Sequence, residues 1–202
     1  MNQAKIVPIF CTPIYISHLD RVFSKKENNI FLKEKTIKNI GNYFSKETFI
    51  LNKACFKQLK NEILSHIDNY INNIICPLKK INFYITQSWL NYSRETEFHH
   101  EHSHPNSFIS GVLYIKANKE NDEIVFASDK NKVWDIPPKQ YNIFNSYYWK
   151  IPVEDYKLIL FPSSLKHSVS IKKENNLRIS LAFNVLIKGE IGDKKSLTYM
   201  KL

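Results

Sequence analysis

The sequence contains only four glycines and three cysteines among its 202 residues, and both scarcities restrict what it can be. With so few glycines, most turns must be made by Asn, Asp, Ser and Pro. The cysteines Cys11, Cys55 and Cys76 are odd in number, far apart in the sequence and form no C-x-x-C pair. We therefore expect reduced thiols in a cytoplasmic protein rather than a disulfide framework.

Two targeting segments are also missing. The first residues, Met1–Lys5, lack the charged and apolar regions of a signal peptide. No apolar run approaches the length that crosses a bilayer. We expect a soluble intracellular protein without a membrane partner.

The chain is basic, with a formal net charge of +10, which raises the question of a nucleic-acid partner. Its lysines are dispersed in short pairs such as Lys25–Lys26, and no stripe of alternating aromatic and basic residues is visible. We interpret them as solvated surface residues and keep nucleic-acid binding as the less favoured alternative. The hydrophobic content of 43% and the chain length favour one folded domain.

The first 80 residues are predicted to contain one strand and two helices. Residues 6–16 are β-branched and punctuated by proline, which is typical of an extended strand. Residues 22–41 are charged with scattered apolar positions and predict a helix that ends at Gly41. Apolar residues recur at three- and four-residue spacing over 53–75, which predicts an amphipathic helix that Pro77 ends.

From residue 81 the pattern changes to short β-strands. The segments expected to form strands are 83–92, 107–116, 123–127, 141–149, 157–162, 165–171 and 177–187. Such a series after two helices predicts a mainly β fold with flanking helices (α+β), a jelly-roll barrel. We expect a single domain over 1–202, with supporting elements over 1–80, the barrel over 81–187 and a loosely held polar tail over 188–202.

Four of the seven histidines lie within six residues, which makes this segment the most informative of the chain. Imidazole is the commonest metal ligand in proteins. In an extended strand, residues two apart point to the same face, so His102 and His104 should project together. His100 would share their face, as a third local ligand or a neighbour of the ligands, whereas His99 and Glu101 would face the other way.

Two residues further along complete the predicted site. His167 follows the apolar run Leu158–Pro162 and is the natural third metal ligand. Arg178 should lie on the next antiparallel strand, with Ser180 on its face, and a guanidinium binds a carboxylate by a planar two-point contact. Alone, each feature has a simpler explanation: a solvated or zinc-scavenging loop, a polar strand end, a salt-bridge partner. The ordered combination H-x-H, F-P-x-x-x-x-H and R-x-S favours a metal site with a carboxylate-bearing cosubstrate.

These motifs resemble a family of 2-oxoglutarate/Fe(II) oxygenases found in marine bacteria and their phages. The similar segments are Ile9–Tyr15, Ser88–Asn91, His102–Ser107, Ser110–Tyr114, Leu160–Ser163 with His167, and Arg178–Ser180 with Phe183 and Asn184. The likeness touches most of the chain and is densest over 84–187. It implies a double-stranded β-helix fold, Fe(II), and 2-oxoglutarate and dioxygen as cosubstrates.

Carried over by position, the resemblance implies that His102, His104 and His167 hold iron and that Arg178 with Ser180 holds 2-oxoglutarate. Most of the wider superfamily has H-x-D or H-x-E where this chain has His104. A third imidazole removes one negative charge from the iron shell, which should alter its redox poise. The pair His99-x-Glu101 also spells H-x-E, and we rank it second.

Asn91 and Tyr114 are candidates for the pocket wall, where either could donate to the 2-oxoglutarate carboxylates; core packing is an equally good explanation of Tyr114. The aromatic stretch 141–149 is a candidate lining or cap of the substrate pocket. The predicted function is hydroxylation of an unidentified small metabolite, peptide or nucleobase by an Fe(II)- and 2-oxoglutarate-dependent dioxygenase. Two alternatives stay open: a cupin-like metal-binding protein without 2-oxoglutarate, and a noncatalytic jelly-roll binding module.

Overall fold

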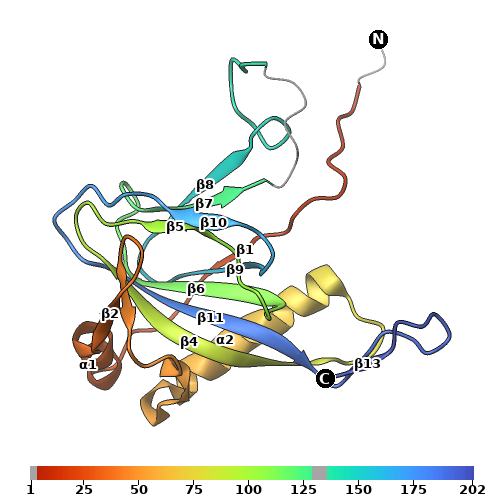
Figure 1. Ribbon diagram of the computed structural model, residues 1–202, viewed down its shortest axis with the longest axis horizontal. Helices are drawn as coiled ribbons and strands as arrows, with labels where there is room; N and C mark the ends of the chain where they lie inside the picture. The colour runs from red at the N-terminus through yellow and green to blue at the C-terminus, as the bar shows by residue number, and fades with distance from the viewer. Residues whose placement is uncertain (1–3, 129–135) are drawn as a thin grey trace.

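Two antiparallel β-sheets face each other in the computed structural model, which describes residues 4–128 and 136–202 (Figure 1). The larger sheet has the order β1-β9-β6-β11-β4-β3-β2 and the smaller one β5-β10-β7-β8. The strands of the larger sheet are β1 (Tyr15–His18), β2 (Thr36–Lys38), β3 (Tyr43–Ser45), β4 (Asn82–Ser93), β6 (Ile109–Lys116), β9 (Lys157–Pro162) and β11 (Arg178–Lys188). Those of the smaller sheet are β5 (His99–His102), β7 (Glu123–Ala127), β8 (Tyr148–Pro152) and β10 (His167–Val169).

The helices cover the outer face of the larger sheet (Figure 1). A capping box between Ser24 and Glu27 starts α1 (Lys25–Lys33). The 3₁₀ turns η1 (Ile50–Asn52) and η2 (Ala54–Phe56) lead into α2 (Lys57–Tyr70), which a π-helical turn η3 (Ile71–Ile75) extends. The predicted apolar stripe of the second helix is therefore confirmed, since its Leu59, Ile63 and Ile67 are fully buried. No helix in the described residues is long and apolar enough to cross a bilayer.

Strand β11 lies at the centre of the larger sheet, and its two faces have different compositions. The residues packed against the helices are apolar: Ile179, Leu181, Phe183 and Val185. The alternate residues, which face the smaller sheet, are Arg178, Ser180, Ala182 and Asn184. A two-residue alternation therefore separates a structural core from an interior that carries polar groups.

The predicted helix over 22–41 is wrong in its second half. The helix α1 ends at Lys33, and β2 and β3 then form a hairpin. The β-branched Thr36 and Ile37 favour a strand over a helix. Gly41 does not cap a helix but occupies the hairpin turn with φ of +84°, and a Cβ there would meet the ring of Phe98.

Three other sequence predictions need correction. The strand expected over 6–16 forms only at β1, and residues 4–12 before it are exposed, since the register of β1 with β9 begins at Tyr15. The strand expected over 141–149 lies later, at β8, because the Asn142 and Asn145 side chains form local turns with the backbone. The tail over 188–202, predicted to be without structure of its own, contains a short hairpin in which β12 (Glu190–Ile191) pairs with β13 (Met200–Lys201).

We predict that replacing Gly111 of β6 by Ala destabilises the fold by about 1–3 kcal/mol through overpacking. A Cβ at this position would lie 2.1 Å from Cζ of Phe183 on the adjacent strand. Urea unfolding measures the loss. The double variant Gly111→Ala/Phe183→Leu should recover part of it, because the smaller side chain relieves the overlap. An unchanged stability in the single variant would contradict this packing.

Candidate metal centre and cosubstrate pocket

A bulge in β5 determines which histidines face the space between the sheets. Strand β10 pairs with β5 so that His167 is opposite His102 and Val169 is opposite His99. The paired residues are two apart on β10 but three apart on β5, so β5 contains an extra residue. His99 and His102 consequently share the inward face, and their rings stack with centroids 4.5 Å apart. The expectation that His99 faces away assumed a regular strand and is wrong.

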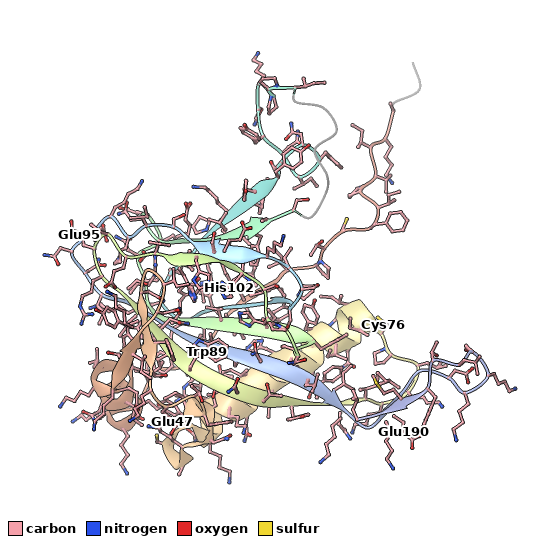
Figure 2. All side chains as sticks on the ribbon, in the orientation of Figure 1. Glu47, Cys76, Trp89, Glu95, His102 and Glu190 are labelled. Atoms are coloured by element: carbon pink, nitrogen blue, oxygen red, sulfur yellow. The ribbon has the colours of Figure 1, made fainter. Side chains whose placement is uncertain are left out.

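His102, His104 and His167 form the one cluster of potential metal ligands found in the described residues. Their ligating nitrogens all lie within 4.8 Å of one another. His104 follows β5 in a turn whose position is fixed by a hydrogen bond from its backbone N–H to the Ser163 carbonyl, at 2.9 Å. Glu101, the alternative ligand, is exposed and lies outside this cluster. Figure 2 shows His102 in the space between the two sheets.

Each of the three imidazole rings is oriented by an acceptor at Nδ1. The acceptors are the carbonyls of His100 and Leu165 and Oδ1 of Asn184, at 2.8, 3.1 and 2.6 Å from His102, His167 and His104 respectively. Carbonyl oxygens only accept, so each Nδ1 carries the proton and each Nε2 presents a lone pair. The Nε2 atoms of His102 and His104 are 3.1 Å apart, and two lone pairs at this distance repel unless a cation lies between them. The donor set therefore fits a metal ion.

Burial keeps these imidazoles neutral. Burial, followed by the charge of His102, lowers the pKa of His167 to about 2. Burial also lowers the pKa of His99 to about 3, with His102 as the next contribution. The pKa values of His102 and His104 are lowered as well, again chiefly by burial. Neutral imidazole is the form that binds a metal, so the cluster is ready for an ion at neutral pH.

The residues predicted to bind the cosubstrate lie on the inward face of the larger sheet. Ser180 on β11 is opposite Asn91 on β4 and Tyr114 on β6, so the three form one row across the larger sheet. Arg178 is two residues beyond Ser180 on the same inward face and is 4% exposed. Its Nη1 donates to Oδ1 of Asp122 at 2.9 Å, whereas Nη2 is buried and has no hydrogen-bond partner among the described residues. The structure thus brings Arg178, Ser180, Asn91 and Tyr114 together.

A cavity of about 420 Å³ opens beside His102 and His104. Its wall includes Trp89 on β4, which Figure 2 places on the larger sheet, and Asn39 and Phe44 of the β2–β3 hairpin. No sequence pattern indicated Asn39, which lies in the segment predicted to be a helix, or Phe44, which follows the predicted helix end at Gly41. None of the described residues that line the cavity is Asp, Glu, Lys or Arg. The stretch 141–149, expected to line or cap the pocket, contributes none of these lining residues.

The depressed histidine pKa values make the stability of the metal-free protein depend on pH. The unfolded histidines take up protons near pH 6.5, whereas His167 and His99 stay neutral in the folded state down to about pH 2 and 3. The unfolded state then binds more protons, so we expect the free energy of unfolding to fall below pH 6.5. The slope is about 1.4 kcal/mol per pH unit for each such histidine.

Urea unfolding of the metal-free protein between pH 7 and 5 measures this slope. Carboxylates also titrate towards acid pH, so the informative quantity is the difference between the parent protein and His167→Gln, a variant of similar size that cannot titrate. We expect a shallower slope in His167→Gln. Identical slopes in the two proteins would show that His167 is not held neutral.

Comparison with known proteins connects this site to a family. Residues 87–184 match the family model described as "Putative 2OG-Fe(II) oxygenase". No curated protein matches the sequence. A Burkholderia pseudomallei oxidoreductase of the 2OG-Fe(II) oxygenase family is 12% identical, with a TM-score of 0.57 over 81% of this chain and 79% of that one.

Two further solved structures show the same fold. HygX from Streptomyces hygroscopicus, solved with nickel and 2-oxoglutarate bound, is 9% identical with a TM-score of 0.59 over 86% of this chain and 82% of that one. A Pseudomonas putida prolyl-4-hydroxylase is 10% identical with a TM-score of 0.55 over 86% and 92%. The predicted double-stranded β-helix is confirmed. The matched segment contains the histidine cluster and Arg178, so this part of the chain is similar to the 2-oxoglutarate/Fe(II) oxygenase family, whose cosubstrates are 2-oxoglutarate and dioxygen.

Proposed function

We propose that His102, His104 and His167 hold Fe(II) and that Arg178 with Ser180 holds the distal carboxylate of 2-oxoglutarate. The protein is then a dioxygenase that hydroxylates a substrate entering the cavity beside His102 and His104. The observation that carries this proposal is the three-histidine cluster, in which Nδ1 of each ring is bound to an acceptor and the ligating nitrogens converge. Three ligands leave open positions on the metal, which a catalytic site requires.

The donor set also favours an anionic cosubstrate. Three neutral imidazoles contribute no negative charge, so the two positive charges of Fe(II) stay uncompensated by the protein. The chelating end of a 2-oxo acid supplies one negative charge, and bound iron with 2-oxoglutarate supplies the oxidising chemistry that protein side chains lack. The side chains bind and orient: the buried, unpartnered Nη2 of Arg178 and the Ser180 hydroxyl can both donate to a carboxylate. Asn91 and Tyr114 complete this row.

Aromatic rings close the back of the site against water. Phe161 meets His167 edge-on with ring centroids 4.7 Å apart, and Phe126 packs against Phe161 at 5.1 Å. The open side is the cavity, whose amide and aromatic lining suits a neutral part of a metabolite, peptide or nucleobase. The three cysteines are free, which supports a reducing compartment, and we place the protein in the cytoplasm.

One observation favours a second candidate, a metal-binding protein without 2-oxoglutarate. Arg178 already donates to Asp122, so its guanidinium is not wholly available to a ligand. An anaerobic titration with Fe(II), with and without 2-oxoglutarate, separates the two candidates. We expect a weak visible charge-transfer band of the chelate only when both are present.

Single variants test which residues bind the iron and which bind 2-oxoglutarate. We predict that His167→Ala loses iron binding and the band together. Arg178→Ala should bind iron normally but require roughly tenfold or more 2-oxoglutarate to develop the band, because a charge-assisted contact is lost. Arg94→Ala is the matched control, since Arg94 is exposed at the end of β4. Iron binding without a band would favour the second candidate, and no iron binding would leave a noncatalytic binding module.

We also predict that Asn184 sets the metal affinity through His104. Its Oδ1 accepts from Nδ1 of His104 at 2.6 Å, and loss of such a partner typically weakens metal binding roughly 10–100-fold. The Asn184→Leu variant should show this loss in a titration with Co(II), whereas Asn184→Asp keeps an acceptor and should keep the affinity. Equal affinities in Asn184→Leu and the parent protein would remove this role.

A further inference from the structure

A cluster of three charged side chains, Asp122, Lys172 and Arg178, lies next to the row formed by Ser180, Asn91 and Tyr114. We call that row the cosubstrate row. The three charged side chains are 2%, 1% and 4% exposed, so all three charges lie inside the protein. Oδ1 of Asp122 accepts from Nη1 of Arg178 at 2.9 Å and from Nζ of Lys172 at 3.2 Å. The two cations therefore share one carboxylate oxygen and lie close together.

The cluster joins three segments that are distant in sequence. Asp122 precedes β7, Lys172 follows β10 and Arg178 begins β11. The other carboxylate oxygen of Asp122 accepts from Nζ of Lys172 at 3.3 Å and from the backbone N–H of Asn118 at 2.9 Å. The backbone N–H of Lys172 donates to the Glu97 carbonyl at 2.8 Å. These bonds fix Asp122 and Lys172, and through them the guanidinium.

The cluster has two cations and one anion, which leaves a surplus of one buried positive charge. A buried charge without a counter-ion is strongly unfavourable. Glu174, a further carboxylate that interacts with Lys172, lies at the surface, where it accepts from Asn118 and Asn121. An Arg178–Asp122 pair alone would be neutral, so the surplus depends on Lys172.

The part of the cluster nearest the cosubstrate row is the guanidinium of Arg178. Nη2 of Arg178 is the buried donor that lacks a partner among the described residues. Burial raises the pKa of Tyr114, and the charge of Arg178 opposes that rise, so the guanidinium lies near the Tyr114 ring. Ser180, in the same row as Tyr114, is partly exposed although Ile179 and Leu181 beside it are buried. One carboxylate placed between Arg178 and Ser180 would satisfy both the donor and the charge.

We propose that Lys172 and Asp122 are positioning residues that make this end of the pocket selective for a 2-oxo acid with a second carboxylate. Asp122 holds Nη1 of Arg178 so that Nη2 stays free, and Lys172 supplies the positive charge that Asp122 would otherwise cancel. The inference rests on the proposed function, because it assigns the far end of the 2-oxoglutarate site. It adds a selectivity role for two residues that the sequence did not single out.

The test compares two 2-oxo acids of equal chain length, 2-oxoglutarate and 2-oxopentanoate, which has a methyl group in place of the distal carboxylate. Calorimetric titration of the Fe(II)-loaded protein without oxygen gives both dissociation constants. We expect the parent protein to prefer 2-oxoglutarate. In Lys172→Met that preference should fall roughly tenfold or more through weaker 2-oxoglutarate binding, with 2-oxopentanoate within about twofold of the parent value. Lys173→Met, which removes the neighbouring exposed lysine, should behave as the parent protein.

Other outcomes have distinct meanings. If both acids lose affinity equally in Lys172→Met, or the preference is unchanged, Lys172 has only a structural role and the inference is wrong. Thermal unfolding gives a second readout: 2-oxoglutarate should raise the midpoint of Asp122→Asn more than that of the parent protein, because this variant lacks the internal counter-ion. An equal or smaller rise would contradict the role of Asp122. Failure of the parent protein to bind 2-oxoglutarate would instead overturn the proposed function itself.

Discussion

The alternation of β11 is the constraint on which both the core and the site depend. Its apolar residues must face the helices, because Leu181 and Phe183 are part of the core that α2 closes. The alternate residues are thereby committed to the interior of the barrel, which places Asn184 against His104 and Arg178 against Asp122. A shift of one residue in register would expose the core and remove both contacts together. The register of β11 therefore determines both the packing of the core and the positions of the polar residues of the site.

The metal centre adds a second local constraint, the bulge in β5. Because of the extra residue, His99 joins His102 on the inward face, and the two rings stack. Burial and the charges of His102 and His104 lower the pKa of His167, and the charge of His99 adds to this effect. The turn after β5 then returns His104 to the same space, where Ser110 and Asn184 both contact its Nδ1. The bulge in β5 and the segment after it thus bring the histidine side chains into one space.

The alternation of residues in the sequence was sufficient to predict part of this arrangement. Alternation predicted that His102 and His104 come together, and they do. The expectation that Arg178 lies on the strand next to His167 is wrong, because β10 and β11 belong to different sheets. The bulge could not be predicted, because it depends on pairing with β10 rather than on the sequence of β5. The hairpin that carries Phe44 was not predicted, because its first strand falls within the segment predicted to be a helix. Asp122 and Lys172 gave no signal because only the tertiary fold brings them to Arg178.

The two ends of the site have the same electrostatic character. At the proposed iron site, His104 stands where the resemblance to the wider superfamily implies a carboxylate, so the ligand set that we propose is neutral. At the inner end, Lys172 outweighs Asp122 and leaves one positive charge around Arg178. In the proposed function, a ligand with a carboxylate at each end would offset positive charge at both places, and 2-oxoglutarate is such a dianion. His104 in the histidine cluster and the buried Lys172 would then belong to one arrangement, in which the cosubstrate supplies negative charge that the protein does not.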